Sequence, residues 1–181
     1  MARGLLVIDI QRDYFPGGAM PLVGPEAAAE AAGTVLDVFR DAGDAVVHLR
    51  HAWDSPEATF MRPGTPGQEI HPLAAPADGE PVLDKTEPNG FLGTDLAGTL
   101  ERLKIDDLHV VGMMSSMCVD ATVRAAADLG LKLTVIHDAC AAPDLEFGGV
   151  AVPGAMVHAA FMAALADGYA EVVDSSALQA G

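Results

Sequence analysis

The sequence of 181 residues has few cysteines, few basic side chains and no long apolar segment. Its two cysteines, Cys118 and Cys140, form neither a CxxC pair nor a disulfide framework, which favours a reduced compartment. Lys and Arg number 10 against 26 Asp and Glu, and the net charge of -16 argues against nucleic acid or an anionic membrane as partner. No segment approaches the roughly 18 apolar residues of a membrane span. We therefore expect a cytoplasmic protein.

Apolar residues make up 50% of the chain, which is enough to bury one sizeable core. The sequence contains no internal repeat and no linker between two compositionally different halves. These observations predict a single domain over residues 1–181.

Short apolar runs alternate with helical patterns along the whole chain. The runs that predict strands are 4–10, 45–50, 82–84, 108–113, 131–137 and 169–173. Helical periodicity or capping signals mark 26–41, 95–104, 115–130 and 154–166. This alternation is typical of an α/β fold, with a parallel sheet covered by helices on both faces. The Pro-rich segment 51–81 and the segment 143–153 are expected to be loops, the first a lid or pocket wall.

The segment 110–130 organises the rest of the chain. An apolar strand breaks at Gly112 and continues as a helix, for which Ser115 or Ser116 is a candidate N-cap. Cys118 then lies in the first turn, where the positive end of the helix dipole favours a thiolate. A strand-to-helix turn of this kind suits a nucleophile that attacks a carbonyl. Taken alone, the same thiol is equally consistent with a small buried apolar side chain.

Three reactive side chains stand at the ends of predicted parallel strands: Asp9, Lys85 and Cys118. Open α/β sheets bind ligands beyond the carboxyl ends of their strands, where the strand order reverses. If the first and fourth strands are neighbours there, the three side chains can converge. Cys118 would attack a carbonyl, Asp9 would take the thiol proton, and Lys85 would stabilise the thiolate. An ordinary Asp9–Lys85 ion pair is the alternative, but the coincidence at three strand ends favours a catalytic site.

Three blocks of the sequence resemble the isochorismatase-like cysteine hydrolases, the family that includes the nicotinamidase-related amidohydrolases. The blocks are LLVIDIQRDYF at 5–15, VLDKTEPNGFLGTDL at 82–96 and VVGMMSSMCV at 110–119. The resemblance covers nearly the whole chain. It implies a six-stranded, mostly parallel sheet flanked by helices on both faces, a three-layer arrangement like that of the Rossmann fold.

The same resemblance assigns roles to individual residues. It maps the family's catalytic triad onto Asp9, Lys85 and Cys118. It also implies a cis peptide bond between Met113 and Met114, with an oxyanion hole formed by the backbone amides of Met114 and Cys118.

Two differences from members of the family narrow the expected chemistry. Nicotinamidase-like members carry an Asp-x-His metal motif after the second strand, whereas this chain has His51-Ala-Trp53. We therefore expect neither a metal nor a cofactor, although His51 could still act as a ligand by itself. Isochorismatase, which cleaves an enol ether, lacks the cysteine. The presence of Cys118 therefore favours hydrolysis of an amide or a related C–N bond through a thioester.

Four loop aromatics are candidates for the wall of the substrate pocket, and simple packing is nearly as common for such residues. They are Tyr14, Phe15, Trp53 and Phe91. The methionines near Cys118 are expected to form an adaptable apolar floor: Met113, Met114 and Met117. Cys140 has no charged neighbours in the sequence and is expected to be buried and structural.

The leading hypothesis is a metal-independent cysteine amidohydrolase that acts on a small molecule. One alternative is an ester or enol-ether hydrolase on the same scaffold, and another is a catalytically silent binding protein. The resemblance and the alanine-rich helices also favour a homo-oligomer, either a dimer or a tetramer.

Overall fold

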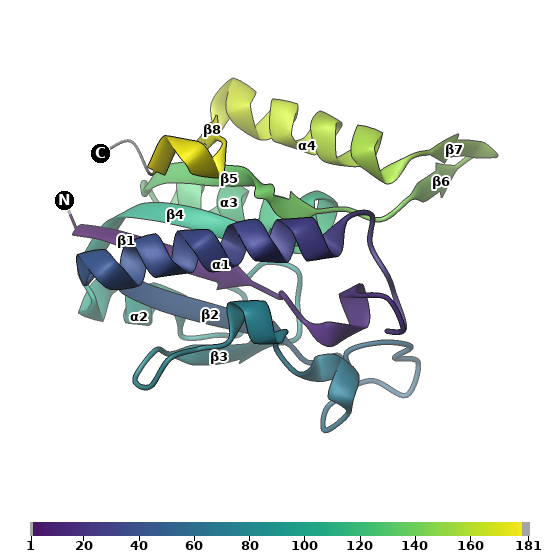
Figure 1. The fold of residues 1–181 in the computed structure, drawn as a ribbon, viewed down its shortest axis with the longest axis horizontal. Helices are drawn as coiled ribbons and strands as arrows, with labels where there is room; N and C mark the ends of the chain where they lie inside the picture. The colour runs from purple at the N-terminus through teal and green to yellow at the C-terminus, as the bar shows by residue number, and fades with distance from the viewer. Residues whose placement is uncertain (1, 179–181) are drawn as a thin grey trace.

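The computed structural model describes residues 2–178. Its main feature is a six-stranded sheet in the order β3-β2-β1-β4-β5-β8, in which every neighbouring pair is parallel (Figure 1). The strands are β1 (Ala2–Ile8), β2 (Ala45–His51), β3 (Val82–Lys85), β4 (Ile105–Met113), β5 (Lys132–Ala141) and β8 (Glu171–Val173). The predicted six-stranded parallel sheet is therefore confirmed.

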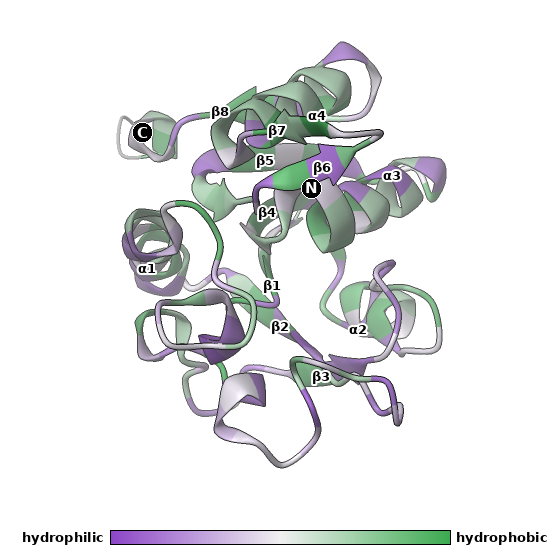
Figure 2. Ribbon diagram, turned by 90° about the vertical axis from the view of Figure 1, so that its right-hand side faces the viewer, coloured by the Kyte–Doolittle hydropathy of each residue, from purple (hydrophilic) through white to green (hydrophobic). Residues whose placement is uncertain are grey.

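Helices cover both faces of the sheet, which separates two apolar cores (Figures 1 and 2). One face packs against α1 (Pro25–Ala42). The other face packs against α2 (Leu96–Arg102), α3 (Asp120–Asp128) and α4 (Gly154–Gly168). No helix within residues 2–178 has both the length and the apolar character needed to cross a membrane.

The local sequence explains where α1 begins and ends. Pro25 occupies its first turn, where the missing N–H of proline costs no hydrogen bond. Gly43 ends the helix in the left-handed region with φ of 73°. The buried side chains recur every three or four residues and form one apolar stripe: Ala28, Ala29, Ala32, Val35, Leu36 and Phe39.

The strand order reverses between β1 and β4, which are neighbours at the centre of the sheet. From β1 the chain moves outward through β2 to β3, and it then returns to the other side of β1 as β4. Gly112 permits the close approach of these two strands, because a Cβ there would collide with the carbonyl oxygen of Ile8. Its φ of 142° is also one that residues with a side chain rarely adopt. The carboxyl ends of β1 and β4 therefore open onto one crevice.

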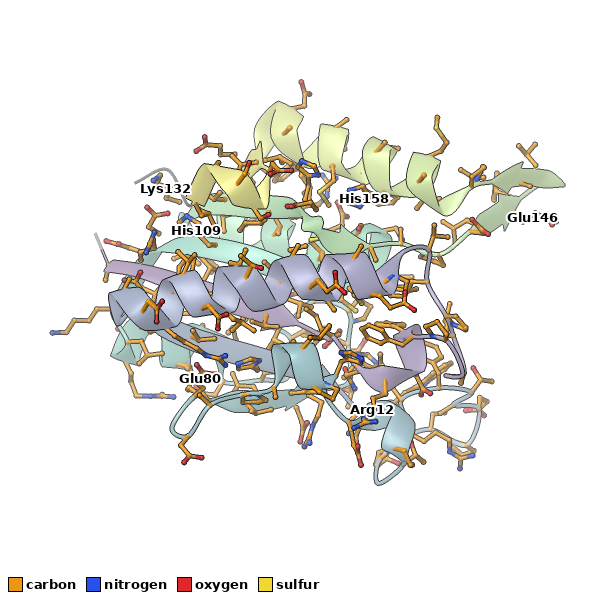
Figure 3. All side chains as sticks on the ribbon, viewed as in Figure 1. Arg12, Glu80, His109, Lys132, Glu146 and His158 are labelled. Atoms are coloured by element: carbon orange, nitrogen blue, oxygen red, sulfur yellow. The ribbon has the colours of Figure 1, made fainter. Side chains whose placement is uncertain are left out.

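The segment 143–153 is not the simple loop that the sequence predicted. It contains an antiparallel hairpin of β6 (Leu145–Phe147) and β7 (Val150–Val152), which extends away from the sheet (Figures 1 and 3). The turn is Gly148-Gly149, and both residues have positive φ, 59° and 80°. A Gly-Gly pair between two short strands is the signal for a two-residue hairpin turn.

Candidate active site

The structure brings Asp9, Lys85 and Cys118 together at the carboxyl edge of the sheet. Asp9 follows β1 with φ of 50°, Lys85 is the last residue of β3, and Cys118 lies in the π-helical turn Ser115–Val119 that leads into α3. The Nζ atom of Lys85 is 2.6 Å from Oδ2 of Asp9 and 3.3 Å from Sγ of Cys118. All three side chains are buried. A charged pair and a thiol thus share one site that is largely closed to water.

Lys85 reaches this position by crossing the end of β2, because β3 and β1 are not adjacent strands. His51, the last residue of β2, lies on that path, with its Nδ1 atom 2.9 Å from Nζ of Lys85. A fourth acceptor for the ammonium is the carbonyl of Glu87, at 3.1 Å. His51 therefore contacts the cluster directly, whereas the sequence suggested only a possible metal ligand. The signal in the sequence that could have predicted this contact is the position of His51 at the end of the second strand.

The contact with Lys85 determines how His51 is protonated. An ammonium has three N–H groups and no lone pair, so Nδ1 of His51 must accept the hydrogen bond. Burial, and then the charge of Lys85, lower the pKa of His51. The neutral ring consequently carries its proton on Nε2, and His51 lines the cavity beside the thiol.

Gln11 holds His51 in place through its backbone. The Oε1 atom of Gln11 accepts from the amide of His51 at 2.7 Å, and Nε2 donates to the carbonyls of His51 at 2.9 Å and Gln68 at 2.8 Å. The Gln11 side chain is fully buried. The side chain of Gln11 thus continues the hydrogen bonding of the sheet past the end of β2. It also connects β2 to the segment around Gln68. The sequence placed Gln11 in a loop and assigned it no role.

The resting thiol is protonated, contrary to the expectation from the helix start. Burial raises the pKa of Cys118 well above its usual value, the charge of Asp9 raises it further, and Lys85 only partly opposes them. Neither Ser115 nor Ser116 caps the turn with its side chain. The Oγ atom of Ser115 instead lies 2.8 Å from Nδ1 of His158 on α4. A base must therefore remove the proton before Cys118 can attack.

The carboxylate of Asp9 can accept further hydrogen bonds. Its Oδ2 atom is close to Lys85, but neither carboxylate oxygen forms a hydrogen bond of regular geometry within residues 2–178. Burying such a group is costly unless it is paired, and the Lys85 ammonium supplies the pairing charge. Although burial lowers the pKa of Lys85, the charge of Asp9 and the hydrogen bond to Cys118 raise it by more. The cluster therefore contains the ammonium of Lys85, the carboxylate of Asp9 and the thiol of Cys118.

The backbone before Cys118 has an unusual path. The peptide bond between Met113 and Met114 is cis. The amides of Met117 and Val119 both donate to the Met114 carbonyl, each at 3.1 Å. The Cys118 amide lies between them in the turn.

A cavity of about 370 Å³ opens beside the thiol. Its lining residues come from four stretches of the chain: Tyr14, Met20, His51, Trp53, Phe60, Thr86, Pro88, Met114, Met117 and Cys118. Tyr14 and Trp53, two of the predicted pocket aromatics, therefore line this cavity, and so do Met114 and Met117. Met113 points instead into the core under α1.

Two of the predicted pocket aromatics lie elsewhere. Phe15 stacks on His71 with ring centroids 3.8 Å apart and is buried in the core beneath α1. Phe91 packs against the opposite core, near Leu100 of α2. Cys140 is buried, as expected, and burial raises its pKa to about 12.

Three potential metal ligands cluster around the thiol. Atoms of Asp9, His51 and Cys118 that could bind a metal lie within 4.8 Å of one another. Each of these side chains already contacts the Lys85 ammonium, at 2.6, 2.9 and 3.3 Å respectively. A metal ion would have to replace that cation, so the cluster fits an ammonium better than a metal.

The chain is similar to members of one protein family over nearly its whole length. The Isochorismatase domain profile matches residues 3–177. The isochorismatase family protein YddQ of Bacillus subtilis (strain 168) is 46% identical over 177 residues and is covered, like this chain, to 98%. Streptothricin hydrolase of Streptomyces noursei is 38% identical, over 91% of this chain and 60% of the relative. Nicotinamidase of Escherichia coli (strain K12) is 28% identical, over 80% of this chain and 85% of the relative.

Solved structures show the same relationship at the level of the fold. The crystal structure of an isochorismatase hydrolase from Oleispira antarctica matches with a TM-score of 0.96 and 49% identity. The match covers 99% of this chain and 97% of the other. The chain therefore belongs to the isochorismatase family of hydrolases.

Proposed function

We propose that the protein is a cysteine hydrolase that cleaves a C–N bond of a small amide through a thioester intermediate. One observation carries the proposal: the ammonium of Lys85 lies 2.6 Å from Asp9 and 3.3 Å from Cys118, at the floor of a cavity. A thiol beside a base and a cation is equipped for nucleophilic attack on a carbonyl. The similarity to nicotinamidase supports an amide as the substrate.

In the first half of the reaction, Asp9 takes the proton of the Cys118 thiol as Sγ attacks the carbonyl carbon. Lys85 compensates the negative charge as it moves from the carboxylate to sulfur. The amides of Met114 and Cys118 stabilise the oxyanion of the tetrahedral intermediate. The C–N bond then breaks, protonated Asp9 gives its proton to the leaving nitrogen, and an acyl thioester remains on Cys118.

In the second half, water attacks the thioester and gives one proton to Asp9. The new tetrahedral intermediate expels the Cys118 sulfur, which recovers its proton from Asp9. The net reaction is an amide plus water to a carboxylic acid plus an amine or ammonia. The resting protonation state is restored without any co-reactant.

The test is to trap the thioester and to match each variant with a control. Cys118→Ala should abolish amine release and acylation, as measured by ammonia detection and intact mass. Cys140→Ala removes the other buried thiol and should keep both. Asp9→Asn should lower kcat by roughly 10²–10⁴-fold, because an amide cannot accept the thiol proton. Turnover by Cys118→Ala would overturn the covalent mechanism.

We also propose that the chain forms a homo-oligomer through α4 and the β6–β7 hairpin. The exposed face of α4 has no charged residue between 154 and 166. Phe147 and Val150 of the hairpin are 87% and 63% exposed, and Met156 of α4 is 63% exposed. Exposed apolar side chains on neighbouring segments are typical of a subunit interface.

A further inference from the structure

Aromatic side chains form one continuous wall of the cavity beside Cys118. Trp53 and Phe60 meet edge to face with their ring centroids 5.2 Å apart, and Tyr14 is 6.2 Å from Phe60. Met20, Met114 and Met117 also line the cavity. Such a surface favours apolar groups, and methionines adapt to their shape.

The cavity offers no counter-ion for a charged substrate. No Lys, Arg, Asp or Glu is found among its lining residues in the described part of the chain. Lys85 lies below the cavity, and its three N–H groups already face four acceptors, so none is free for a substrate. His51 offers no positive charge either, because its Nδ1 atom accepts a hydrogen bond from the Lys85 ammonium and the ring therefore carries a single proton. The polar groups in the cavity can therefore form hydrogen bonds but cannot neutralise a carboxylate.

We propose that the cavity accepts uncharged amides with an apolar acyl group and rejects acyl groups that carry a carboxylate. This proposal rests on the amide hydrolysis proposed above and names the substrate class of the same site. A substrate carboxylate would lose its hydration among Trp53, Phe60 and the methionines without gaining an ion pair. The Lys85 ammonium is already paired with Asp9, and the substrate carboxylate would approach a protein with a net charge of -16.

The same electrostatics act on the product. Hydrolysis converts an uncharged amide into a carboxylic acid that ionises at neutral pH. The cavity that binds the neutral substrate thus disfavours the anionic product, which helps the acid to leave. The volume of about 370 Å³ lies near the lower end of the range for ligand pockets, so the acyl group is small, of the size of one ring.

A series of para-substituted benzamides tests the proposal on the wild-type protein. The methyl compound is uncharged, the monoamide of terephthalic acid is anionic, and the aminomethyl compound is cationic. We expect kcat/KM to be at least about 100-fold higher for the methyl compound than for the anionic one. Equal or faster hydrolysis of the anionic or the cationic compound would overturn the proposal.

A binding measurement separates this proposal from the proposed reaction. Cys118→Ala cannot form the thioester, so calorimetry on this variant reports affinity without turnover. Selective binding of the methyl compound supports the substrate class even if the wild-type protein hydrolyses none of the series. Equal binding of the methyl and anionic compounds, or binding of neither, would contradict it.

A positive charge introduced at the cavity should weaken the preference for the uncharged compound. Met117 lines the cavity and is 47% exposed, so Met117→Lys can place an ammonium at the rim without burying it. The ratio of kcat/KM for the anionic over the methyl compound should rise at least about tenfold. Leu129→Lys is the matched control, because Leu129 is 60% exposed and lies at the far end of α3. An unchanged ratio in Met117→Lys, or an equal rise in the control, would refute the electrostatic argument.

Discussion

Nδ1 of His51 accepts a hydrogen bond from Nζ of Lys85 at 2.9 Å, so a neutral ring orients the cation that joins Asp9 to Cys118. Glutamine can reproduce this arrangement, since its oxygen accepts from Lys85 while its nitrogen donates to the cavity. We expect His51→Gln to keep kcat within about tenfold and His51→Leu to lose roughly 100-fold, with KM changed less.

The pH profile distinguishes this positioning role from a general loss of stability. Burial and the charge of Lys85 lower the pKa of His51 below its usual 6.5, so the ring gains a proton only in acid. Protonation would set an imidazolium against the Lys85 ammonium and remove its acceptor. Activity should therefore fall as the pH drops through this lowered pKa, and His51→Gln should lack that component. Identical acidic limbs in the two proteins would contradict the role of His51.

Dialysis against a chelator should leave activity unchanged, because the Lys85 ammonium contacts the three potential metal ligands. Lys85→Ala removes that ammonium and should let Asp9, His51 and Cys118 bind Zn²⁺ or Cd²⁺. Calorimetry and Cd²⁺–thiolate absorption would measure this binding, with Lys104→Ala as the control at an exposed lysine. Stoichiometric metal in the wild-type protein, with activity lost on its removal, would show that the ammonium does not exclude a metal.

Glu80 ties the turn before β3 to α1 and β2. It accepts from Arg40 at 2.8 Å through both oxygens, lies 2.9 Å from His48 Nε2, and accepts from the Ala77 amide at 2.8 Å. Burial alone would raise the pKa of Glu80, but the bonds from Arg40, Ala77 and His48 lower it from 4.5 to about 2. Because the folded pKa lies below the unfolded value, this stabilisation is complete above about pH 4.5. It is lost as the pH falls towards 2.

We therefore expect the melting temperature of the wild-type protein to fall between pH 4.5 and 2, and to fall less in Glu80→Gln. At neutral pH this variant should lose about 1.5–3 kcal/mol of unfolding free energy. Glu69→Gln is the control, because Glu69 forms an exposed ion pair with Arg12. Figure 3 labels Arg12 and Glu80. Parallel pH curves for wild type and Glu80→Gln would assign the acid sensitivity to other carboxylates.

Much of this fold can be predicted from the sequence, because local sequence patterns determine most of its strands and helices. Buried parallel strands appear as apolar runs, and Gly43 marks the end of α1 through its left-handed conformation. Asp9 and Cys118 stand at the ends of such strands, so their convergence needs only the neighbouring position of β1 and β4. Lys85 is less direct, because its approach to Asp9 depends on a long side chain crossing β2.

The remaining features depend on contacts between distant segments. Phe15 and Phe91 follow Asp9 and Lys85 closely in the sequence. The path of each loop nevertheless directs their side chains towards the apolar cores rather than the cavity. Gln11 and His51 come together only because β2 lies beside β1. The side chain of Gln11 then binds the backbone of His51, which is 40 residues away in the sequence. The raised pKa of Cys118 also depends on tertiary contacts that the local sequence does not show. Burial and the charge of Asp9 outweigh the lowering effect expected at the start of a helix.

The homo-oligomer is testable through α4. Met156 is 63% exposed on α4, where the other exposed residues between 155 and 166 are alanines. It follows closely after the hairpin that carries the exposed Phe147. An isologous contact would bury this surface in both copies at once, so one substitution acts twice. We expect light scattering on the wild-type protein to give a dimer or tetramer of the 18.6 kDa chain, and Met156→Lys to shift it towards the monomer. Leu129→Lys places the same charge on an exposed leucine outside this surface and should keep the wild-type mass. A wild-type protein that is monomeric at micromolar concentration would contradict the assembly, and equal dissociation of both variants would contradict its location.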